Sequence, residues 1–185
     1  FNNIPVRGLL DSAYLDKRAK LIGERSMRIA LPGDTEAPGT SHLSIVDAEG
    51  NVVSMTTTIE ATFGSRIMVR GFLLNNELTD FDFTPSSANS VAPGKRPRSS
   101  MAPTIVFATQ GEMRGRVQLA VGSPGGPNII NYVARALVAM LDWKLDAQAA
   151  VAAPNFGSRN GPTLLEAGSS YEAMKPQLEA RGHPV

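Results

Sequence analysis

The sequence predicts a layered α+β domain, in which antiparallel strands come first along the chain and helices follow. Between residues 40 and 121, segments rich in β-branched residues are separated by short turn-forming sequences, a pattern typical of β-hairpins. After the Gly/Pro-rich segment at residues 122–127, apolar residues recur at helical spacing. A block of strands followed by a block of helices that pack on them gives an α+β fold.

The composition is that of a globular protein with a hydrophobic core. A chain of 185 residues with 42% hydrophobic content usually makes one domain. Its net charge of +1, from 18 basic and 17 acidic residues, argues against nucleic acid or an anionic membrane as the main partner. We interpret the basic run at residues 95–98 (KRPR) as a loop that turns at its proline, with a polyanion site as the alternative.

Several kinds of site and segment are excluded. The sequence has no cysteine, so it has no disulfide, catalytic thiolate or cysteine metal ligand. No apolar run reaches the about 18 residues of a membrane span, and residues 1–3 (FNN) do not begin a signal peptide. Because the chain opens without methionine and ends at residues 182–185 (GHPV) without a terminating signal, we expect it to be a fragment of a longer protein.

The first elements are a helix and a loop. Residues 9–25 carry apolar side chains near helical spacing and predict a short amphipathic helix, with Asp11 or Ser12 as a possible N-cap. Residues 32–39 (PGDTEAPG) predict a loop of low structural content. The boundary between the two parts of the chain lies at the end of this loop.

A β-hairpin follows the loop directly. Residues 40–46 alternate in the manner of a strand, which stops at the turn-rich residues 47–51 (DAEGN). Residues 52–59 (VVSMTTTI) are dominated by β-branched side chains and should return antiparallel. Further strands are predicted at residues 67–69, 71–75, 103–108 and 116–121, the last two joined by a turn at residues 109–112. We therefore expect a sheet of about five or six strands.

Helices dominate the rest of the chain. Residues 129–143 show apolar side chains at helical spacing. The later predicted elements are a helix at residues 146–153, a strand at residues 164–166 and a helix at residues 170–181. Pro154 ends the first of these helices, and Gly182 is the C-terminal stop of the last.

The candidate nucleophile is Thr40, where the loop meets the first strand. A threonine hydroxyl is a poor nucleophile unless a base takes its proton, and an N-terminal threonine carries its own base, an α-amine with a pKa of about 7.7 to 8.0. Exposing that amine requires cleavage of the Gly39–Thr40 peptide by the Thr40 hydroxyl, and glycine leaves its carbonyl open to attack. The alternative is that Pro38 and Gly39 form an ordinary turn before an ordinary strand residue.

Charged and hydroxyl groups that could bind ions occur in two later segments. Glu77 and Asp80 bring two carboxylates three residues apart, which suits an ammonium ion; the alternative is a helix N-terminal turn with acidic residues. Ser99 and Ser100 supply adjacent hydroxyls that can hydrogen-bond a carboxylate; the alternative is a solvated loop before a strand.

A glycine pair follows the last predicted hairpin. Gly125 and Gly126 offer backbone N–H groups that no side chain blocks, which is useful for binding an oxyanion. The alternative is a simple turn between a strand and a helix. Each of these motifs is weak alone, and their combination decides between the alternatives.

Together and in this order, the motifs resemble the γ-glutamyltransferases (γ-glutamyl transpeptidases), members of the N-terminal nucleophile hydrolases. The resemblance is carried by the stretches TSHLSIVDAEGNVVS, LLNNELTDF, KRPRSSMAPT and GSPGG. Residues 40–185 are similar to nearly all of the family's small, catalytic subunit, and residues 1–39 look like the tail of its large subunit with the loop before cleavage. The resemblance implies an αββα sandwich of mainly antiparallel strands, here partial because the family's final strands are absent.

The resemblance also implies roles for single residues. It implies a precursor that cuts itself at Gly39–Thr40 and frees Thr40 as nucleophile and base. Thr58, in the segment TTTIE, matches a second threonine that hydrogen-bonds the nucleophile; the alternative is one more β-branched strand residue. Glu60 stands where many members carry asparagine. In this respect the chain looks like the subgroup that uses glutamate there, and the Glu60 carboxylate can still accept from an ammonium ion.

The other matched positions bind substrate or its transition state. The resemblance implies that Ser99 and Ser100 bind the α-carboxylate of the substrate and that Asp80, with Glu77, binds its α-ammonium. It implies that Gly125 and Gly126 form the oxyanion hole. A zwitterionic amino-acid end explains this mixed polarity, because both charges need partners once they leave water.

Some positions depart from the family pattern. The run at residues 83–92 is short where many members insert a lid, so we expect an open site, accessible to bulky or polymeric donors and to water. Asn155 occupies a position where arginine is usual. The large-subunit arginine that helps to hold the α-carboxylate is absent, as are the final strands, so we expect that this chain alone does not turn over substrate.

The implied activity is cleavage of glutathione or a related γ-glutamyl compound, with transfer of the γ-glutamyl group to an amino acid, a peptide or water. The implied partner is the large subunit of the same precursor, no metal or organic cofactor is required, and the family's habits favour a periplasmic or secreted location. One alternative is a glutaryl-type cephalosporin acylase of the same fold. Glutaryl lacks the α-ammonium, so Asp80 and Glu77 favour a γ-glutamyl substrate. A second alternative is a non-catalytic binding fragment, against which the full set of site residues argues.

Overall fold

The computed structural model describes residues 6–9, 11–20, 39–85 and 87–185. The chain divides into two compact units, residues 1–38 and residues 39–185. The assignment of these parts to a large and a small subunit stays a prediction. The predicted loop at residues 32–39 lies outside the described residues except for Gly39. No helix among the described residues is long and apolar enough to cross a membrane.

The first unit contains two short helices where one was predicted. They are α1 (Val6–Leu9) and α2 (Ser12–Ala19). Asp11 lies between them in an extended conformation, with ψ of 128°, and its side chain accepts a hydrogen bond from the Tyr14 N–H over 2.9 Å. Asp11 is thus the N-cap of α2, one of the two N-caps that the sequence predicted, as a short acidic side chain favours. The separate helix α1, which includes residue 9, was not predicted. The end predicted at residue 25 lies outside the described residues.

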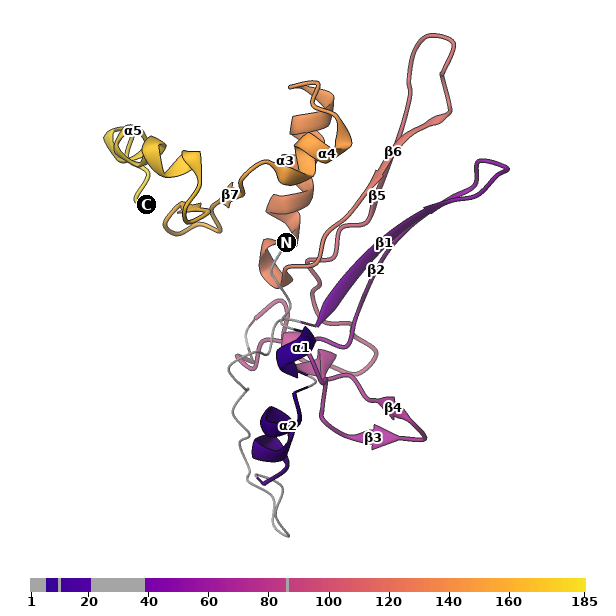
Figure 1. Ribbon diagram of the computed structural model, residues 1–185, viewed down its shortest axis with the longest axis vertical. Coiled ribbons are helices and arrows are strands. Elements are labelled where there is room, and N and C mark those ends of the chain that lie inside the picture. The colour runs from indigo at the N-terminus through magenta and orange to yellow at the C-terminus, as the bar shows by residue number, and fades with distance from the viewer. Residues whose placement is uncertain (1–5, 10, 21–38, 86) are drawn as a thin grey trace. The chain divides into compact units, whose positions relative to one another are not determined.

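The second unit opens with the predicted hairpin. Strand β1 (Thr40–Val46) pairs antiparallel with β2 (Val52–Thr58), so that Val46 lies opposite Val52 next to the turn (Figure 1). The Asp47 carboxylate closes this turn, because its two oxygens accept from the Asn51 N–H over 2.8 Å and from Asn51 Nδ2 over 2.7 Å. The prediction of this hairpin is confirmed.

The other predicted strands form hairpins of their own. Strands β3 (Met68–Val69) and β4 (Phe72–Leu73) are shorter than predicted. Their connection is Arg70 and Gly71, with φ of 51° and 86°, the left-handed pair that a tight two-residue hairpin turn needs. Strands β5 (Thr104–Phe107) and β6 (Val117–Val121) also pair antiparallel, with an irregularity in register at the end of β5.

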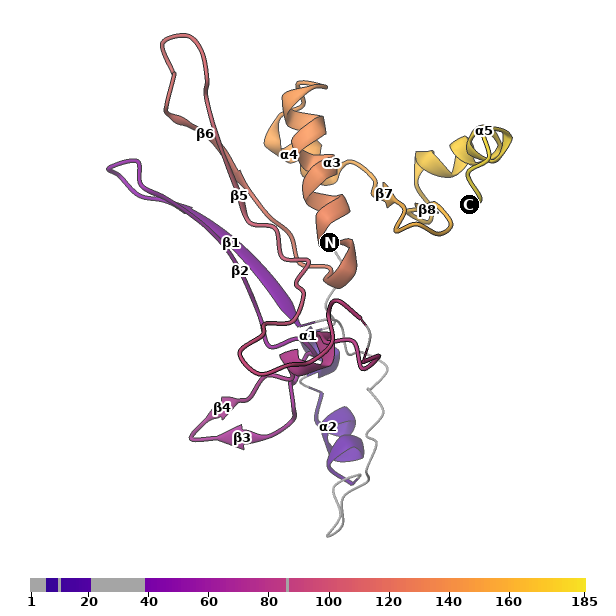
Figure 2. The same cartoon turned by 180° about the vertical axis from the view of Figure 1, so that it is seen from behind.

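The strands do not join into one sheet in the described part of the chain. They form four two-stranded sheets, so the prediction of a single sheet of five or six strands was wrong. The β5–β6 hairpin runs beside the β1–β2 hairpin (Figures 1 and 2). Where β2 meets β6, the Ser54 hydroxyl donates a hydrogen bond to the Val121 carbonyl over 3.3 Å. Because this contact uses a side chain, the two hairpins adjoin without a shared backbone ladder.

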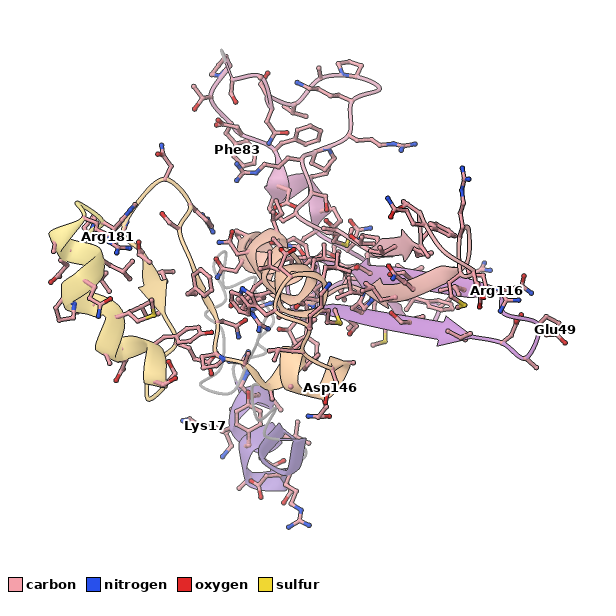
Figure 3. The ribbon with its side chains drawn as sticks, turned by 90° about the horizontal axis from the view of Figure 1, so that it is seen from above. Lys17, Glu49, Phe83, Arg116, Asp146 and Arg181 are labelled. Carbon is pink, nitrogen blue, oxygen red and sulfur yellow. The ribbon has the colours of Figure 1, made fainter. Side chains whose placement is uncertain are left out.

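The helices carry the core. A short 3-10 helix, η2 (Gly126–Asn128), leads into α3 (Ile129–Leu141), and α4 (Ala147–Ala152) follows. The Asp146 side chain, labelled in Figure 3, caps α4 by accepting from the Ala149 N–H over 2.7 Å. The buried apolar side chains of these two helices are Ile129, Val133, Ala136, Ala139 and Ala150. Both predicted helices are confirmed within about two residues, the usual uncertainty of helix ends.

A buried polar network closes the end of this helical layer. Arg135 is only 8% exposed, and it donates to the Ala150 carbonyl over 2.7 Å and to Asn155 Oδ1 over 3.0 Å. Asn155 in turn donates from its backbone and its side chain to Glu166, each over 2.9 Å. These two bonds lower the pKa of the Glu166 carboxyl below its ordinary value. The asparagine that departs from the family pattern therefore links a buried cation to a carboxylate.

The last elements are shorter than predicted. Strand β8 (Leu164–Leu165), predicted as residues 164–166, pairs with β7 (Phe156–Gly157), which was not predicted (Figure 2). The single helix predicted at residues 170–181 is instead a 3-10 helix, η3 (Ser170–Met174), followed by α5 (Lys175–Ala180). Proline at residue 176 explains the break, because it lacks an N–H and suits the first turn of a new helix. Gly182, with φ of 83°, ends α5 as predicted.

Asn155→Ala is expected to destabilise the protein. The substitution leaves the buried Nε–H of Arg135 without its acceptor, which costs about 1–3 kcal/mol. Urea unfolding of the full-length protein measures this loss. The matched control is Gln148→Ala on the exposed face of α4, which should change the free energy of unfolding by less than about 0.5 kcal/mol. Equal midpoints for both variants would show that the network adds nothing to stability.

Candidate active site

The candidate nucleophile and its partner face each other across the β1–β2 hairpin. Thr40 is the first residue of β1 and lies opposite Thr58, the last residue of β2. Directly opposed side chains project to the same face of a sheet, and Thr40 Oγ1 donates a hydrogen bond to Thr58 Oγ1 over 3.2 Å. Both side chains are half-buried. The Thr40 hydroxyl is therefore oriented by a neighbour, as an activated nucleophile requires.

Glu60 holds Thr58 from the other side. Its backbone N–H donates to Thr58 Oγ1 over 2.8 Å, and its carboxylate accepts from Asn76 Nδ2 over 2.8 Å. Glu60 has φ of 71°, a left-handed conformation that is costly for a residue with a side chain. A strained residue held by contacts at both ends is typical of a functional site.

Asn76 joins the acidic segment to the hairpin and was not among the predicted site residues. Its N–H donates to the Ile59 carbonyl over 3.2 Å, and its side-chain oxygen accepts from the Ala61 N–H over 3.1 Å. The same side chain donates to Glu60. An amide has donor and acceptor atoms and can bind a backbone and a carboxylate at once. Its position directly before Glu77 is the signal that could have identified it.

Glu77 and Asp80 are the first and last residues of a 3-10 helix, η1 (Glu77–Asp80), so a helical turn is the local structure here. The Oε1 atom of Glu77 is buried and has no hydrogen-bond partner among the described residues. Burial raises the pKa of the Glu77 carboxyl, and the charges of Asp80 and Glu60 raise it further. A cluster of carboxylates with an unsatisfied oxygen would be stabilised by a cation.

The predicted serines lie on a segment that is tied to Asp80. Asn89 Nδ2 donates to the Asp80 carbonyl over 2.7 Å, and Asn89 Oδ1 accepts from the Arg98 N–H over 3.0 Å. Ser99 follows directly; it is exposed, and its hydroxyl accepts from the Met101 N–H over 3.2 Å. Ser100 is half-buried. Asn89 thus connects the two segments predicted to grip opposite charges of one ligand.

The segment after η1 presents a large apolar side chain to solvent. Phe83, labelled in Figure 3, is 78% exposed. Lys95 Nζ donates to the carbonyls of Ala88 and Ser90 over 2.6 and 3.0 Å. Because the first residue of the basic run helps to close this loop, the structure supports the loop interpretation of the run over a polyanion site.

The predicted oxyanion glycines form the turn between β6 and α3. Gly125 and Gly126 have φ of 138° and 55°, which residues with a side chain rarely adopt. A Cβ atom on Gly125 would lie 2.6 Å from a ring carbon of Tyr132. The turn between a strand and a helix is the observed structure, and its N–H groups as an oxyanion hole stay a prediction.

Gly39 lies where no side chain fits. A Cβ atom on Gly39 would lie 2.8 Å from the Ala61 carbonyl oxygen and 2.9 Å from Thr62 Cα. Close packing therefore favours glycine here, in addition to the openness of its carbonyl. The residue before Thr40 therefore packs against the backbone of residues 61–62.

The structure brings the predicted residues together to different degrees. Thr40, Thr58 and Glu60 form one hydrogen-bonded group, and Asn76 links this group to η1. The hydrogen bonds of the described residues do not join the serine pair or the glycine pair directly to Thr40. The roles of all predicted site residues stay predictions.

A family model identifies the same relatives as the motifs do. The model described as Gamma-glutamyltranspeptidase matches residues 1–185, which is the whole chain. The chain belongs to the gamma-glutamyltranspeptidase family. The resemblance inferred from the motifs is therefore confirmed.

Named members and relatives of the family are similar along nearly the whole chain. A "Glutathione hydrolase proenzyme" of Bacillus subtilis (strain 168) is 39% identical over 205 residues, which cover 99% of this chain and 34% of the relative. An "Acylase ACY 1 proenzyme" of Pseudomonas sp. (strain SE83) is 38% identical over 190 residues, which cover 100% of this chain and 33% of the relative. The chain spans about a third of the length of these curated relatives.

A solved structure of a gamma-glutamyltranspeptidase has the same fold. The mutant enzyme of Helicobacter pylori matches with a TM-score of 0.70 at 36% sequence identity, over 77% of this chain and 82% of that chain. The predicted fold class, an α+β N-terminal nucleophile hydrolase with antiparallel strands, is confirmed by this likeness.

Glu77→Gln is expected to stabilise the protein near neutral pH. The folded pKa of Glu77 is raised above the ordinary 4.5, so its contribution to stability is present below pH 4.5 and lost as the pH rises through the folded pKa. Glutamine resembles the neutral carboxyl and avoids this loss. Urea midpoints of the full-length protein at about pH 4 and about pH 8 should differ less in the variant than in the wild type.

The matched control for this experiment is Glu112→Gln, at an exposed position in the β5–β6 turn. It should leave the difference between the two midpoints unchanged. If Glu77→Gln behaves like this control, burial does not raise the pKa of the Glu77 carboxyl.

Proposed function

We propose that this chain carries the catalytic centre of a γ-glutamyltransferase, which cleaves the γ-glutamyl amide of glutathione or a related compound. The observation that carries the proposal is the hydrogen bond from Thr40 Oγ1 to Thr58 Oγ1, connected through Glu60 and Asn76 to a cluster of carboxylates. The family and the glutathione hydrolase proenzyme among its relatives support this substrate class.

Maturation begins with the Thr40 hydroxyl in the precursor. Its oxygen attacks the Gly39 carbonyl carbon, the C–N bond between Gly39 and Thr40 breaks, and the nitrogen gains the hydroxyl proton. Water then hydrolyses the resulting ester, which leaves a carboxylate on Gly39 and a free α-amine on Thr40. The close packing of Gly39 against the backbone of Ala61 and Thr62 supports this step, because it restricts the residue whose carbonyl is attacked and leaves no room for a side chain on it.

In the mature protein the α-amine of Thr40 is the general base. It takes the hydroxyl proton as Oγ1 attacks the γ-carbonyl carbon of the donor, and it passes that proton to the leaving amine as the amide bond breaks. An acceptor amine or water then attacks the γ-glutamyl ester, and its proton returns through the α-amine to Oγ1. The N–H groups of Gly125 and Gly126 stabilise the oxyanion that forms in both steps.

Donor recognition uses the two charges of an amino-acid end. The carboxylates of Glu77, Asp80 and Glu60 bind the α-ammonium, and the hydroxyls of Ser99 and Ser100 bind the α-carboxylate. The buried oxygen of Glu77, which has no hydrogen-bond partner in the described part of the chain, supports this assignment, because a cation would relieve the penalty of its burial. The exposed Phe83 supports a site that is open to bulky or polymeric donors and to water.

We also propose that the whole protein contains a large subunit from the same precursor, which completes the donor site. The separation of residues 1–38 from residues 39–185 as compact units supports a division of the precursor at this point. Amino acids, peptides and water are the proposed acceptors, and the proposed location is the periplasm or the exterior of the cell.

An acylase is the second candidate, because a proenzyme of that name is nearly as similar to this chain as the glutathione hydrolase is. An acylase whose acyl group has no α-ammonium would gain nothing from Glu77 and Asp80. The two carboxylates would then destabilise the site, since like charges close together repel. The cluster therefore favours the γ-glutamyl substrate.

Thr58→Val should lower kcat for γ-glutamyl transfer about 10- to 100-fold, because misplacing a reacting group by about 1 Å has an effect of this size. Valine keeps the shape of threonine and removes only the hydroxyl that meets Thr40. The neighbouring Thr57→Val is the matched control, since this side chain is exposed, and its kcat should stay unchanged.

Thr40→Ala should abolish self-cleavage, which mass spectrometry of the full-length protein measures. An active Thr40→Ala variant would refute the nucleophile assignment.

Asp80→Asn should distinguish the two candidate functions. With a γ-glutamyl donor, loss of a charged partner of the α-ammonium should lower kcat/KM about 30-fold or more, whereas a glutaryl donor should be affected little. The exposed Asp82→Asn is the control for the local change of charge. A wild-type protein that prefers the glutaryl donor, and is indifferent to Asp80→Asn, would be an acylase.

A further inference from the structure

His42 lies on the nucleophile's strand and is held by two hydroxyls. It is two residues beyond Thr40 in β1, so both side chains project to the same face of the hairpin. Its Nδ1 atom lies 2.9 Å from Thr56 Oγ1, directly across the hairpin, and its Nε2 atom lies 3.1 Å from Ser44 Oγ. The orientation of the imidazole is therefore set by hydrogen bonds at both ring nitrogens.

The same ring fills the space beside Gly122. A Cβ atom on Gly122 would lie 2.1, 2.2 and 2.7 Å from three atoms of the His42 ring. Gly122 follows the last residue of β6 and precedes the Gly125–Gly126 turn by three residues. The hydrogen bond between Ser54 and Val121 brings β2 and β6 together at the same place. The imidazole is thus the packing contact between the nucleophile hairpin and the start of the glycine turn.

We propose that His42 is a positioning residue, which sets the distance between the Thr40 hydroxyl and the N–H groups of the Gly125–Gly126 turn. The proposal rests on the function proposed above, in which these groups act on the same carbonyl. A close-packed contact resists compression, and removing it allows the two segments to shift. An oxyanion hole requires N–H groups about 2.7–3.1 Å from the developing oxyanion, so such a shift lowers the rate.

The environment of the ring favours its neutral form. In the described part of the chain, its hydrogen-bond partners are the Thr56 hydroxyl from β2 and the Ser44 hydroxyl from β1, and neither carries a charge; the backbone at Gly122 beside it is also uncharged. Burial lowers the pKa of His42 below the ordinary 6.5. A neutral imidazole can donate from one nitrogen and accept at the other, which suits two hydroxyl partners.

A double-mutant cycle in the full-length protein tests the contact. Gly122→Ala should lower kcat about 10- to 100-fold, because the new methyl group must displace the ring and with it the geometry of the site. In a His42→Ala background the same substitution should change kcat by less than about threefold, because the methyl group then enters the space that the ring has left. The KM for the γ-glutamyl donor should stay nearly constant in all variants. Rates are expressed per self-cleaved chain, measured by intact mass.

Gly161→Ala is the matched control, since nothing lies within 4 Å of a Cβ atom there, and its kcat should equal that of the wild type. An equal loss from Gly122→Ala in both backgrounds would overturn the proposal. If Gly122→Ala does not fold or self-cleave, His42→Ala alone decides: a lower kcat with unchanged KM supports positioning, and any other result refutes it. A wild-type protein that self-cleaves but has no γ-glutamyl activity would instead refute the proposed function.

Discussion

The register of the β1–β2 hairpin is the constraint on which the site depends. Side chains alternate between the two faces of a strand, so a slip of one residue would move Thr58 away from Thr40 to the opposite face. The Asp47 and Asn51 contacts fix this register at the turn. At the other end, the Thr40–Thr58 bond and the Glu60 N–H hold the last pair. A turn that closes the hairpin thus determines which hydroxyls meet at its far end.

Two features near this hydroxyl pair lower the stability of the folded protein. Glu60 keeps a left-handed backbone conformation, and Glu77 keeps a buried oxygen without a partner among the described residues. Both features are unfavourable in the free protein, and the repulsion that raises the pKa of Glu77 adds to them. Asn76 holds the Glu60 carboxylate in place in spite of this repulsion, because it donates to that carboxylate and also accepts from the Ala61 backbone. Such a loss of stability is expected in a binding site, where a bound cation offsets it.

Local patterns in the sequence predicted those elements that short-range physics determines. The hairpin at residues 40–58 and helix α3 were found because alternation and helical spacing reflect one buried face. The cap at Asp11 was predicted, but the separate helix α1 and the separate strand pairs were missed. Sheet assembly depends on contacts distant in sequence, which local patterns do not reveal. In the candidate site, motif resemblance predicted the threonines and acids, whose roles stay predictions. It did not find Asn76, whose role becomes visible only when the backbone of residues 59–61 is brought beside it.

Whole-chain identity does not distinguish the two candidate functions, because the glutathione hydrolase and acylase relatives are 39% and 38% identical to this chain. Discrimination between acyl groups that differ by one ammonium depends instead on a few charges, since an unpaired charge in a site is far more costly than a small change in shape. The carboxylates of Glu77 and Asp80 are such charges. These charges distinguish a γ-glutamyl substrate from a glutaryl substrate, whereas similarity of the fold does not.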